Sequence, residues 1–518
     1  MKESTKREST LATYIVMACT LASRLLGFVR EALINHFFGA GSSADVLRAI
    51  FNFPNNMRKL LAEGALSSAF IPELSRQLVE DESGKKAKSL TASILGLLLL
   101  ITIPLTLLFI IFPGAAVNIL TDFKDPAQTE LGTRLMPLLI SYIFFVSISA
   151  LLMGVLNSHK RFFVPAITPV FFSISVISSV LLFHDRLGIF SMAMGVIGGG
   201  IGQILIQIPS FRKLGYSLKP SLSFKSEEFR RVMVSWGPIL LTSSIFSVNQ
   251  IIAQRFASML EVGSISAMNN AIIFWQLPFG LFVNSLLTVI YPKMSRQVAA
   301  GDMDGLGESL IYGWRGLMAM LLPSAAVFMT IGAPIIAVAM QRGEFTSHNT
   351  LMAAEVLFAY STGLLFVGAY NFSQRAFYAL GDYKTPIKVS LVLVAVDILF
   401  SVLFLFVWKV GVSGLAYANT IAYFAGLFIY FFVIQKRVTL SGGRKLLITL
   451  GKVFAALAAG LLWLWFMNRL WGNEWWTGGY SFRALGILMF YGLGYVVVVL
   501  GAYHLLKVEF LSIMRRKG

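Results

Sequence analysis

Arginine side chains concentrate in one stretch near the start of the chain, and together they could bind an anion. Between Ser23 and Pro72 the cations outnumber the acids, with Arg24, Arg30, Arg48, Arg58 and Lys59 set against Glu31, Asp45 and Glu63. A guanidinium presents its N–H donors in a planar fork that matches carboxylate and phosphate oxygens. A cation that faces lipid at the centre of a membrane helix costs about 2.5–3.5 kcal/mol. Because the surrounding chain is strongly apolar, we predict that these residues line a polar cavity built for an anion.

Individual arginines of this stretch have a second interpretation. Arg30 and Arg48 fall near the outer ends of their expected helices, where a long side chain can reach the headgroups while its stem stays in lipid. Arg24 and Arg58 lie several turns from either surface, given a rise of about 1.5 Å per residue. We expect Arg24, Arg30 and Arg58 to converge on one anion, with headgroup contact as the alternative for Arg30 and Arg48.

The composition is that of a membrane protein. Of 518 residues, 56% are hydrophobic and only 13% are charged, and the mean hydropathy is +0.74. Apolar stretches of about 20 residues, long enough to cross about 30 Å of hydrocarbon, recur along the whole chain. We predict an all-α polytopic fold with about fourteen transmembrane helices. Breaks are expected at Pro54-Asn55-Asn56 and at the glycine run Gly198-Gly199-Gly200.

The basic residues also orient the chain in the membrane. The net charge is +18. If the N-terminus lies inside, most Lys and Arg residues between the helices fall in cytoplasmic segments, as the positive-inside rule requires. We therefore predict that both termini are cytoplasmic. The excess charge follows from topology, so we expect membrane lipids and no nucleic acid as partners.

Two features of the sequence repeat at nearly one spacing. Ile71-Pro-Glu-Leu-Ser-Arg-Gln77 matches Tyr291-Pro-Lys-Met-Ser-Arg-Gln297 after 220 residues, and Pro165 matches Pro386 after 221. Both copies of the longer segment are expected on the cytoplasmic side, which indicates parallel repeats about an axis along the membrane normal. The predicted parts are a six-helix lobe at 1–220, a second six-helix lobe at 221–440, and two extra helices at 441–518.

The sequence carries no pattern typical of an enzyme. Walker loops, Cys/His metal spacings, HExxH and GxSxG are all missing from it. Phosphoryl or glycosyl transfer would require clustered carboxylates or a metal-binding pair on one face. The acids expected within the membrane are solitary instead, so we predict a protein that is not an enzyme and holds no metal cofactor.

One carboxylate falls deep within an apolar helix of the second predicted lobe. Burying an unpaired Asp397 would be costly, so it must be protonated, paired or bound to a cation. Ser401 lies one turn further along the same helix face, and Asn249 and Thr420 on neighbouring helices could add neutral oxygens. Such a set suits Na⁺ or a proton and predicts an ion-coupling site. The alternative is a protonated Asp397 that serves packing alone.

Several motifs together resemble the MurJ (MviN) family of the MOP exporter superfamily. The resemblance spans nearly the whole chain, and its first block is specific. The motifs are Ser23-Arg-Leu-Leu-Gly-Phe-Val-Arg-Glu31, Phe38-Gly-Ala-Gly with Ala44-Asp45, Pro54-Asn55 with Arg58, Ala62-Glu-Gly-Ala65 with Ala69-Phe-Ile-Pro72, and Gly381-Asp-Tyr-Lys-Thr-Pro386.

The resemblance implies a bacterial flippase for lipid II, the undecaprenyl-pyrophosphate-linked peptidoglycan precursor. It implies fourteen helices, two lobes that rock around a central cavity, and two extra helices that form a groove for the lipid tail. By matching position, it also implies substrate-binding roles for Ser23, Arg24, Arg30, Asp45 and Arg58. The location would be the bacterial cytoplasmic (inner) membrane.

One departure from the family pattern affects the second lobe. Where such proteins usually carry Ala-Asp-Arg, this sequence has Ala271-Ile272-Ile273. We therefore predict that Arg255, late in the preceding helix, supplies the missing substrate-binding cation. The alternative is that Arg255 reaches outward to the headgroups.

These observations favour one function over the others. A flippase that moves lipid II by alternating access accounts for the cations, the repeat and the extra helices together. The alternatives are a flippase for another polyprenyl-linked glycan and a MOP-type drug or cation antiporter, although a cation exporter would need acids in its cavity. A membrane-embedded transferase is a further alternative, and it would require a new covalent product. We expect a monomer that binds lipid II and works beside the cell-wall synthesis machinery.

Overall fold

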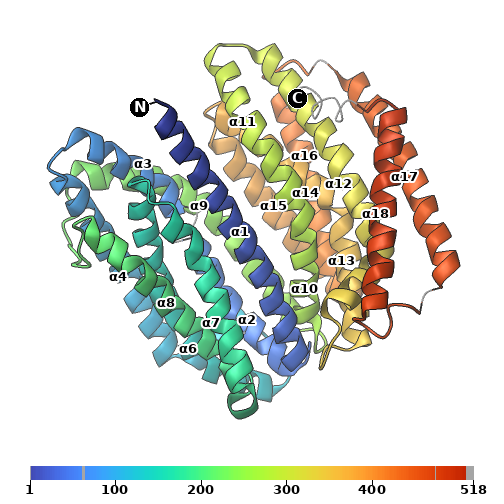
Figure 1. Cartoon of the computed structure of the whole chain (residues 1–518), viewed down its shortest axis with the longest axis horizontal. Coiled ribbons are helices and arrows are strands. Elements are labelled where there is room, and N and C mark those ends of the chain that lie inside the picture. The colour runs from blue at the N-terminus through green and yellow to red at the C-terminus, as the bar shows by residue number, and fades with distance from the viewer. Residues whose placement is uncertain (1, 61–64, 441, 473, 509–518) are drawn as a thin grey trace. The chain divides into compact units, whose positions relative to one another are not determined.

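The computed structural model describes residues 2–60, 65–440, 442–472 and 474–508, and every regular element in those ranges is a helix (Figure 1). This confirms the all-α prediction. Residues 62–64 of the Ala-Glu-Gly-Ala motif lie outside the described part of the chain. By its internal contacts the chain divides into an N-terminal unit, Met1–Met259, and a C-terminal unit, Leu260–Gly518.

The N-terminal unit contains nine helices in the described residues. They are α1 (Lys2–Phe38), α2 (Ser42–Arg58), α3 (Ala65–Glu80), α4 (Lys85–Ile111), α5 (Pro113–Leu120), α6 (Pro126–Ser158), α7 (Phe163–Leu187), α8 (Phe190–Lys213) and α9 (Glu227–Ser258). Helix α6 packs against α2, α4 and α8, while α1 packs along α7. Helix α9 packs against α2, α3, α4 and α5, which places it in this unit.

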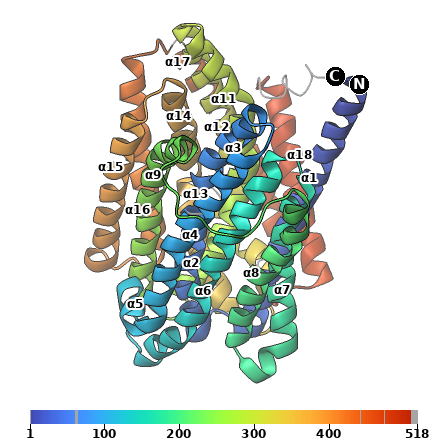
Figure 2. The same ribbon diagram turned by 90° about the vertical axis from the view of Figure 1, so that its left-hand side faces the viewer.

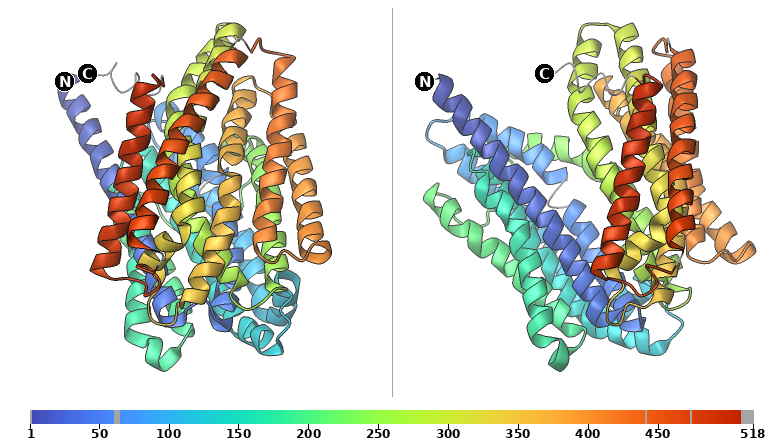
Figure 3. Two further views of the ribbon diagram at one scale, coloured as in Figure 1. Left: turned by 90° about the vertical axis from the view of Figure 1, so that its right-hand side faces the viewer. Right: turned by 45° about the vertical axis from the view of Figure 1, so that its right-hand side comes forward.

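The C-terminal unit is also helical throughout its described residues. Its elements are α10 (Ser264–Pro278), η2 (Phe279–Val283), α11 (Asn284–Ala299), α12 (Met303–Met340), α13 (Ser347–Thr362), α14 (Leu364–Ala379), α15 (Lys384–Val402), η3 (Leu403–Val407), α16 (Ser413–Gln435), α17 (Gly443–Trp471) and α18 (Phe482–Leu505). Helices α15 and α16 pack side by side, as do α17 and α18 (Figures 2 and 3).

Eleven helices of the described chain are long and apolar enough to cross a membrane. A twelfth crossing is added if the pair α13 and α14, bent by 46° at its break, counts as one span. The expected break at Pro54-Asn55-Asn56 is wrong, because α2 runs through Pro54 to Arg58. The expected break at Gly198-Gly199-Gly200 is wrong, because α8 runs through it without interruption.

The repeated sequence features occupy equivalent places in their helices. Pro165 is the third residue of α7, and Pro386 is the third residue of α15. Proline is tolerated there because the first turn of a helix leaves its N–H groups without intrahelical acceptors. The longer repeat lies near the C-terminal ends of α3 and α11.

In each unit, the backbone of a linker between two helices packs directly against a glycine of another helix. The chain between α8 and α9 crosses α4, where the N–H of Ser221 donates to the Ala92 carbonyl at 2.9 Å (Figure 2). An added Cβ on Gly96 would lie 2.1 Å from the Ser221 carbonyl oxygen. In the C-terminal unit, a Cβ on Gly307 would lie 2.2 Å from the carbonyl oxygen of Thr439 in the linker after α16. Both contacts require glycine.

The last two helices pack on α12 (Figure 3), and α18 does so through two tyrosine hydroxyls. Pro323 has no N–H, so the carbonyl of Ala319 one turn earlier loses its helical donor. The Tyr503 hydroxyl donates to that carbonyl at 2.7 Å, and the Tyr495 hydroxyl donates to the Pro323 carbonyl at 3.1 Å. Helix α18 thus satisfies a carbonyl that the proline leaves without a donor.

Candidate functional site

Arg30 lies in the C-terminal half of α1, on the face that packs toward α7. Its Nη2 is 3.0 Å from a carboxylate oxygen of Glu31, and its guanidinium carbon lies 5.4 Å from the centre of the Phe172 ring in α7. The Nε–H of Arg30 is buried and meets no acceptor among the described residues. Ser23 precedes Arg30 by two helical turns and therefore shares its face of α1. The guanidinium is thus only partly engaged by its neighbours, and its side chain is 20% exposed.

Arg58 closes the last turn of α2. Its Nε and Nη2 donate to the side-chain oxygen of Asn55 at 3.2 and 3.1 Å. Arg58 lies within electrostatic reach of Arg30, and both arginines lie within reach of Tyr142 in α6. Two like charges within electrostatic reach repel each other, and an anion between them would relieve that repulsion. Both arginines belong to the N-terminal unit, and their joint binding of an anion stays a prediction.

Arg48 belongs to a second polar cluster, at the turn between α1 and α2. It is only 8% exposed, and it donates to the side chain of Asn35 at 2.5 Å and to the Gly39 carbonyl at 3.4 Å. Asp45, 3% exposed, and Glu31 lie within electrostatic reach of it. Arg48 thus stabilises the turn between α1 and α2 through its hydrogen bonds rather than contacting headgroups.

Arg24, by contrast, is exposed, while Ser23 beside it is half-buried. Among the described residues, the structure therefore brings Arg30 and Arg58 together but does not place Arg24 in direct contact with them.

Arg255 lies at the end of α9 and contacts the C-terminus of α5. Its Nη1 donates to the carbonyls of Asn118 and Ile119 at 2.5 and 2.7 Å, and Nη2 lies 3.8 Å from Asp122. A cation at a helix C-terminus is favoured by the partial negative charge of the last carbonyls. These contacts lie in the N-terminal unit, whereas the sequence pattern placed Arg255 in the second lobe. Its role in substrate binding stays a prediction.

The residues predicted to couple an ion are divided between the two units. Asp397 and Ser401 are buried, 5% and 4% exposed, and lie one turn apart on α15. Thr420 on α16 lies 3.2 Å from the Thr362 hydroxyl, whereas Asn249 belongs to α9 in the N-terminal unit. Within the C-terminal unit, Tyr360 and Tyr423 lie within electrostatic reach of Asp397. Sequence reasoning missed both tyrosines because apolar helices contain many aromatic residues.

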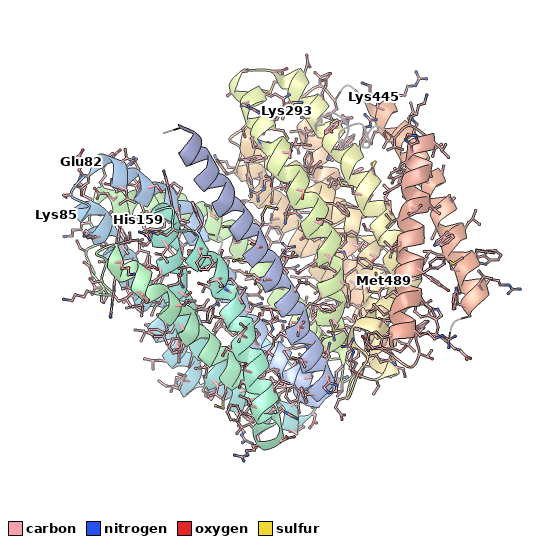
Figure 4. The ribbon with its side chains drawn as sticks, in the orientation of Figure 1. Glu82, Lys85, His159, Lys293, Lys445 and Met489 are labelled. Atoms are coloured by element: carbon pink, nitrogen blue, oxygen red, sulfur yellow. The ribbon has the colours of Figure 1, made fainter. Side chains whose placement is uncertain are left out.

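Charged side chains outside the spans include a group at one end of each unit. Figure 4 labels Glu82, Lys85 and His159 together in the N-terminal unit, and Lys293 and Lys445 together in the C-terminal unit.

Asp382, in the turn after α14, lies 2.7 Å from Arg437. Burial opposes ionisation of Asp382, but hydrogen bonds from Thr385 and Arg437 outweigh it, so the pKa of its carboxyl lies below the ordinary value.

The family model described as lipid II flippase MurJ matches residues 34–486 of this chain. The chain belongs to the MurJ family. A MurJ-family relative from Borreliella burgdorferi, named a probable lipid II flippase, is 31% identical over 96% of this chain and 97% of its own length. A relative from Vibrio cholerae with the same name is 29% identical over 93% of both chains.

Solved structures agree with the MurJ assignment. A structure described as lipid II flippase MurJ in an inward closed conformation superposes with a TM-score of 0.78 at 26% identity, covering 95% of this chain and 99% of that one. An inward-facing multidrug transporter of the MATE family and MOP superfamily has a TM-score of 0.69 at 12% identity, covering 82% of this chain and 97% of that one. At that identity the second likeness concerns the fold alone.

Proposed function

We propose that this MurJ-family chain flips lipid II from the inner to the outer leaflet of the bacterial cytoplasmic membrane. The observation that carries the proposal is the pair Arg30 and Arg58, held within electrostatic reach of each other inside a helical membrane unit. A pyrophosphate has the charge and the oxygens to engage two guanidinium groups at once, through charge-assisted hydrogen bonds. Ser23, Arg24 and Asp45 are proposed to complete the substrate site from the same two helices.

The hydrocarbon tail of the substrate should travel separately from its headgroup. Each CH₂ buried in lipid contributes about 0.8 kcal/mol, so moving a long prenyl chain from lipid into a polar cavity would be unfavourable. We assign the tail to the surface formed by α17 and α18, residues 441–518 of the chain, beside α12. The exposed Trp465, Phe466 and Phe490 supply apolar area on these helices.

Transport would proceed by alternating access of two lobes, 1–220 and 221–440, in a monomeric chain. The bent pair α13–α14, helix α1 and the pair α2–α3, added to the eleven long apolar helices, would make about fourteen crossings. Both termini would then be cytoplasmic. Asp397, with Ser401 and Thr420 of the same unit, is proposed to bind Na⁺ or a proton and to bias the lobes toward one state. Arg255 remains the proposed cation in place of the missing arginine at Ile272-Ile273.

The competing function within this fold is export of a cationic drug. A cation would be repelled by the arginine pair and would need acids in its place. The proposed function therefore rests on the positive charge of the Arg30 and Arg58 pair as well as on membership of the MurJ family.

Complementation tests the proposal directly. The chain should support growth of a bacterial strain depleted of its own lipid II flippase, and Arg58→Ala at equal expression should not. In vesicles, the purified chain should expose fluorescent lipid II to the outer face. Failure of the well-expressed, folded wild-type chain in both assays would overturn the assignment and favour another polyprenyl-linked glycan.

A further inference from the structure

Phe172 lies directly under one of the two arginines of the site. Its ring centre is 5.4 Å from the Arg30 guanidinium carbon, within the distance of about 6 Å at which a cation is attracted to a ring face. Phe172 is only 8% exposed, so the contact forms in a desolvated place. Nothing in the sequence singles out this phenylalanine within an apolar helix.

The Phe172 ring belongs to a small aromatic cluster drawn from three helices. Tyr142 of α6 lies 5.3 Å away between ring centres, and Phe51 of α2 stacks nearly parallel to Phe172 at 6.4 Å. Phe51 and Tyr142 are themselves 6.0 Å apart. Because Tyr142 lies within electrostatic reach of Arg30 and Arg58, the cluster is adjacent to both arginines.

The glycine run of α8 provides the space in which this cluster sits. A Cβ on Gly199 would lie 2.8 Å from a ring carbon of Phe172 and 3.2 Å from its Cα. A Cβ on Gly200 would lie 3.1 Å from a ring carbon of Tyr142. Contacts below about 3 Å to backbone and rigid rings cannot be relieved by a small side-chain movement. The glycine run therefore leaves space for the rings of Phe172 and Tyr142, and it does not break helix α8.

We propose that Phe172 is a positioning residue for anion binding: packed against Gly199, its ring face fixes the Arg30 guanidinium in the orientation that binds the pyrophosphate. The inference rests on the proposed function and names a residue that acts through Arg30. A free arginine side chain loses rotamer entropy when it binds, and a side chain already held in place loses less. The ring can hold the cation without consuming a hydrogen-bond donor, which a carboxylate in its place would do.

Fluorination of the ring separates this role from packing. Fluorine withdraws electron density from the ring face and weakens its attraction for a cation, with little change in size. A series with one, two and three fluorines on Phe172 should weaken binding of lipid II stepwise, by roughly 5- to 30-fold at the end of the series. The same series on Phe51 is the matched control, because within the described part of this cluster the guanidinium lies over Phe172. A flat response at Phe172 in folded protein would overturn the proposal.

Alanine substitutions in α8 test whether packing of Phe172 against Gly199 positions its ring. Gly199→Ala should displace the ring and weaken lipid II binding, while Gly202→Ala, where an added Cβ meets nothing within 4 Å, should not. Thermal unfolding identifies any variant that fails to fold. Equal lipid II affinity for folded Gly199→Ala and Gly202→Ala would show that this packing does not position the ring.

Arg30→Ala distinguishes failure of this inference from failure of the proposed function. Binding should be measured with lipid II and with undecaprenyl pyrophosphate, which lacks the sugars. If Arg30→Ala binds both normally, Arg30 does not hold the pyrophosphate and the proposed site fails. If Arg30→Ala loses both while fluorinated Phe172 binds normally, the site stands and the positioning role falls.

Discussion

The two units of the chain use the same structural devices but bury different polar groups. Each has a proline at the third position of a helix, and each packs a linker carbonyl against a glycine, Gly96 in one and Gly307 in the other. The N-terminal unit then places the half-buried guanidinium group of Arg30 next to an aromatic ring. The C-terminal unit buries hydroxyl groups around one carboxylate, Asp397.

Hydroxyl contacts recur through the C-terminal unit. Tyr370 and Ser390 lie 3.1 Å apart, and the Trp314 indole donates to Ser373 at 3.0 Å. Neutral oxygens can surround a small cation or a protonated carboxyl, whereas arginines suit an anion. The comparison teaches that one helical plan can be given opposite ligand preferences by a few buried side chains.

The largest effect should come from breaking the arginine pair. Arg58→Ala should lower lipid II flipping in vesicles by about 10- to 1,000-fold, because it removes charge-assisted hydrogen bonds worth about 1.5–3 kcal/mol each. Arg58→Lys should recover only part of this. Arg437 of the C-terminal unit is the matched control, since it pairs with Asp382 at 2.7 Å in a turn outside the spans. Arg437→Met should leave lipid II flipping unchanged.

Removal of the buried carboxylate of α15 should affect coupling. Asp397→Asn should keep lipid II affinity and remove the stimulation of flipping by an ion gradient, a loss of about 5- to 150-fold if coupling has its usual size. Glu355, an exposed acid of α13 that accepts from Ser413, serves as the control in Glu355→Gln. Gradient dependence that survives in Asp397→Asn would leave this residue a packing role.

The docking of α18 should be weakened by loss of a single hydroxyl. Tyr503→Phe should lower the free energy of unfolding by about 1 kcal/mol, because the Ala319 carbonyl then has neither a helical donor nor the tyrosine. Tyr495→Phe should cost less, since the Pro323 carbonyl can keep its helical donor. Tyr491→Phe is the control, as that hydroxyl forms no hydrogen bond to α12 among the described residues. Equal stability of all three variants in detergent would show that the hydroxyls add nothing.

The smallest effect concerns pH at the turn after α14 in the C-terminal unit. The pKa of Asp382 is lowered in the folded state, so its contribution to stability is complete above the ordinary value of 3.8 and is lost as pH falls through the lower folded value. The thermal midpoint should therefore fall less steeply below pH 4 in Asp382→Asn than in the wild type. Between pH 5 and 8 the difference between the two proteins should stay constant, and a difference that changes in this range would contradict the assignment.

Sequence alone could predict what charge and periodicity encode. Guanidinium groups are costly in lipid, so Arg30 and Arg58 stand out by residue type and position in the chain. The proline and helix-end repeats are visible because their spacing is regular. Lengths of apolar stretches predicted an all-α fold, although the short, polar α2 and α3 are not among the candidate spans.

Other features depend on neighbours far apart in sequence. Phe172 and Tyr142 look like any core aromatics until α1 and α2 bring arginines to them. The glycine run of α8 suggested a break, because a sequence does not reveal which rings will occupy the space that glycine leaves. The position of Arg255 in the sequence predicts that it replaces a missing cation. The sequence does not show that its guanidinium donates to carbonyls at the end of α5.

The bond from Tyr503 to Ala319 also has a consequence for biosynthesis. A ribosome releases α12 long before α18, so the carbonyl that Pro323 leaves without a helical donor enters the bilayer before its tyrosine exists. An unsatisfied carbonyl in hydrocarbon is costly. Until α18 has been made, water, another helix or a local change in α12 has to satisfy that carbonyl in place of Tyr503.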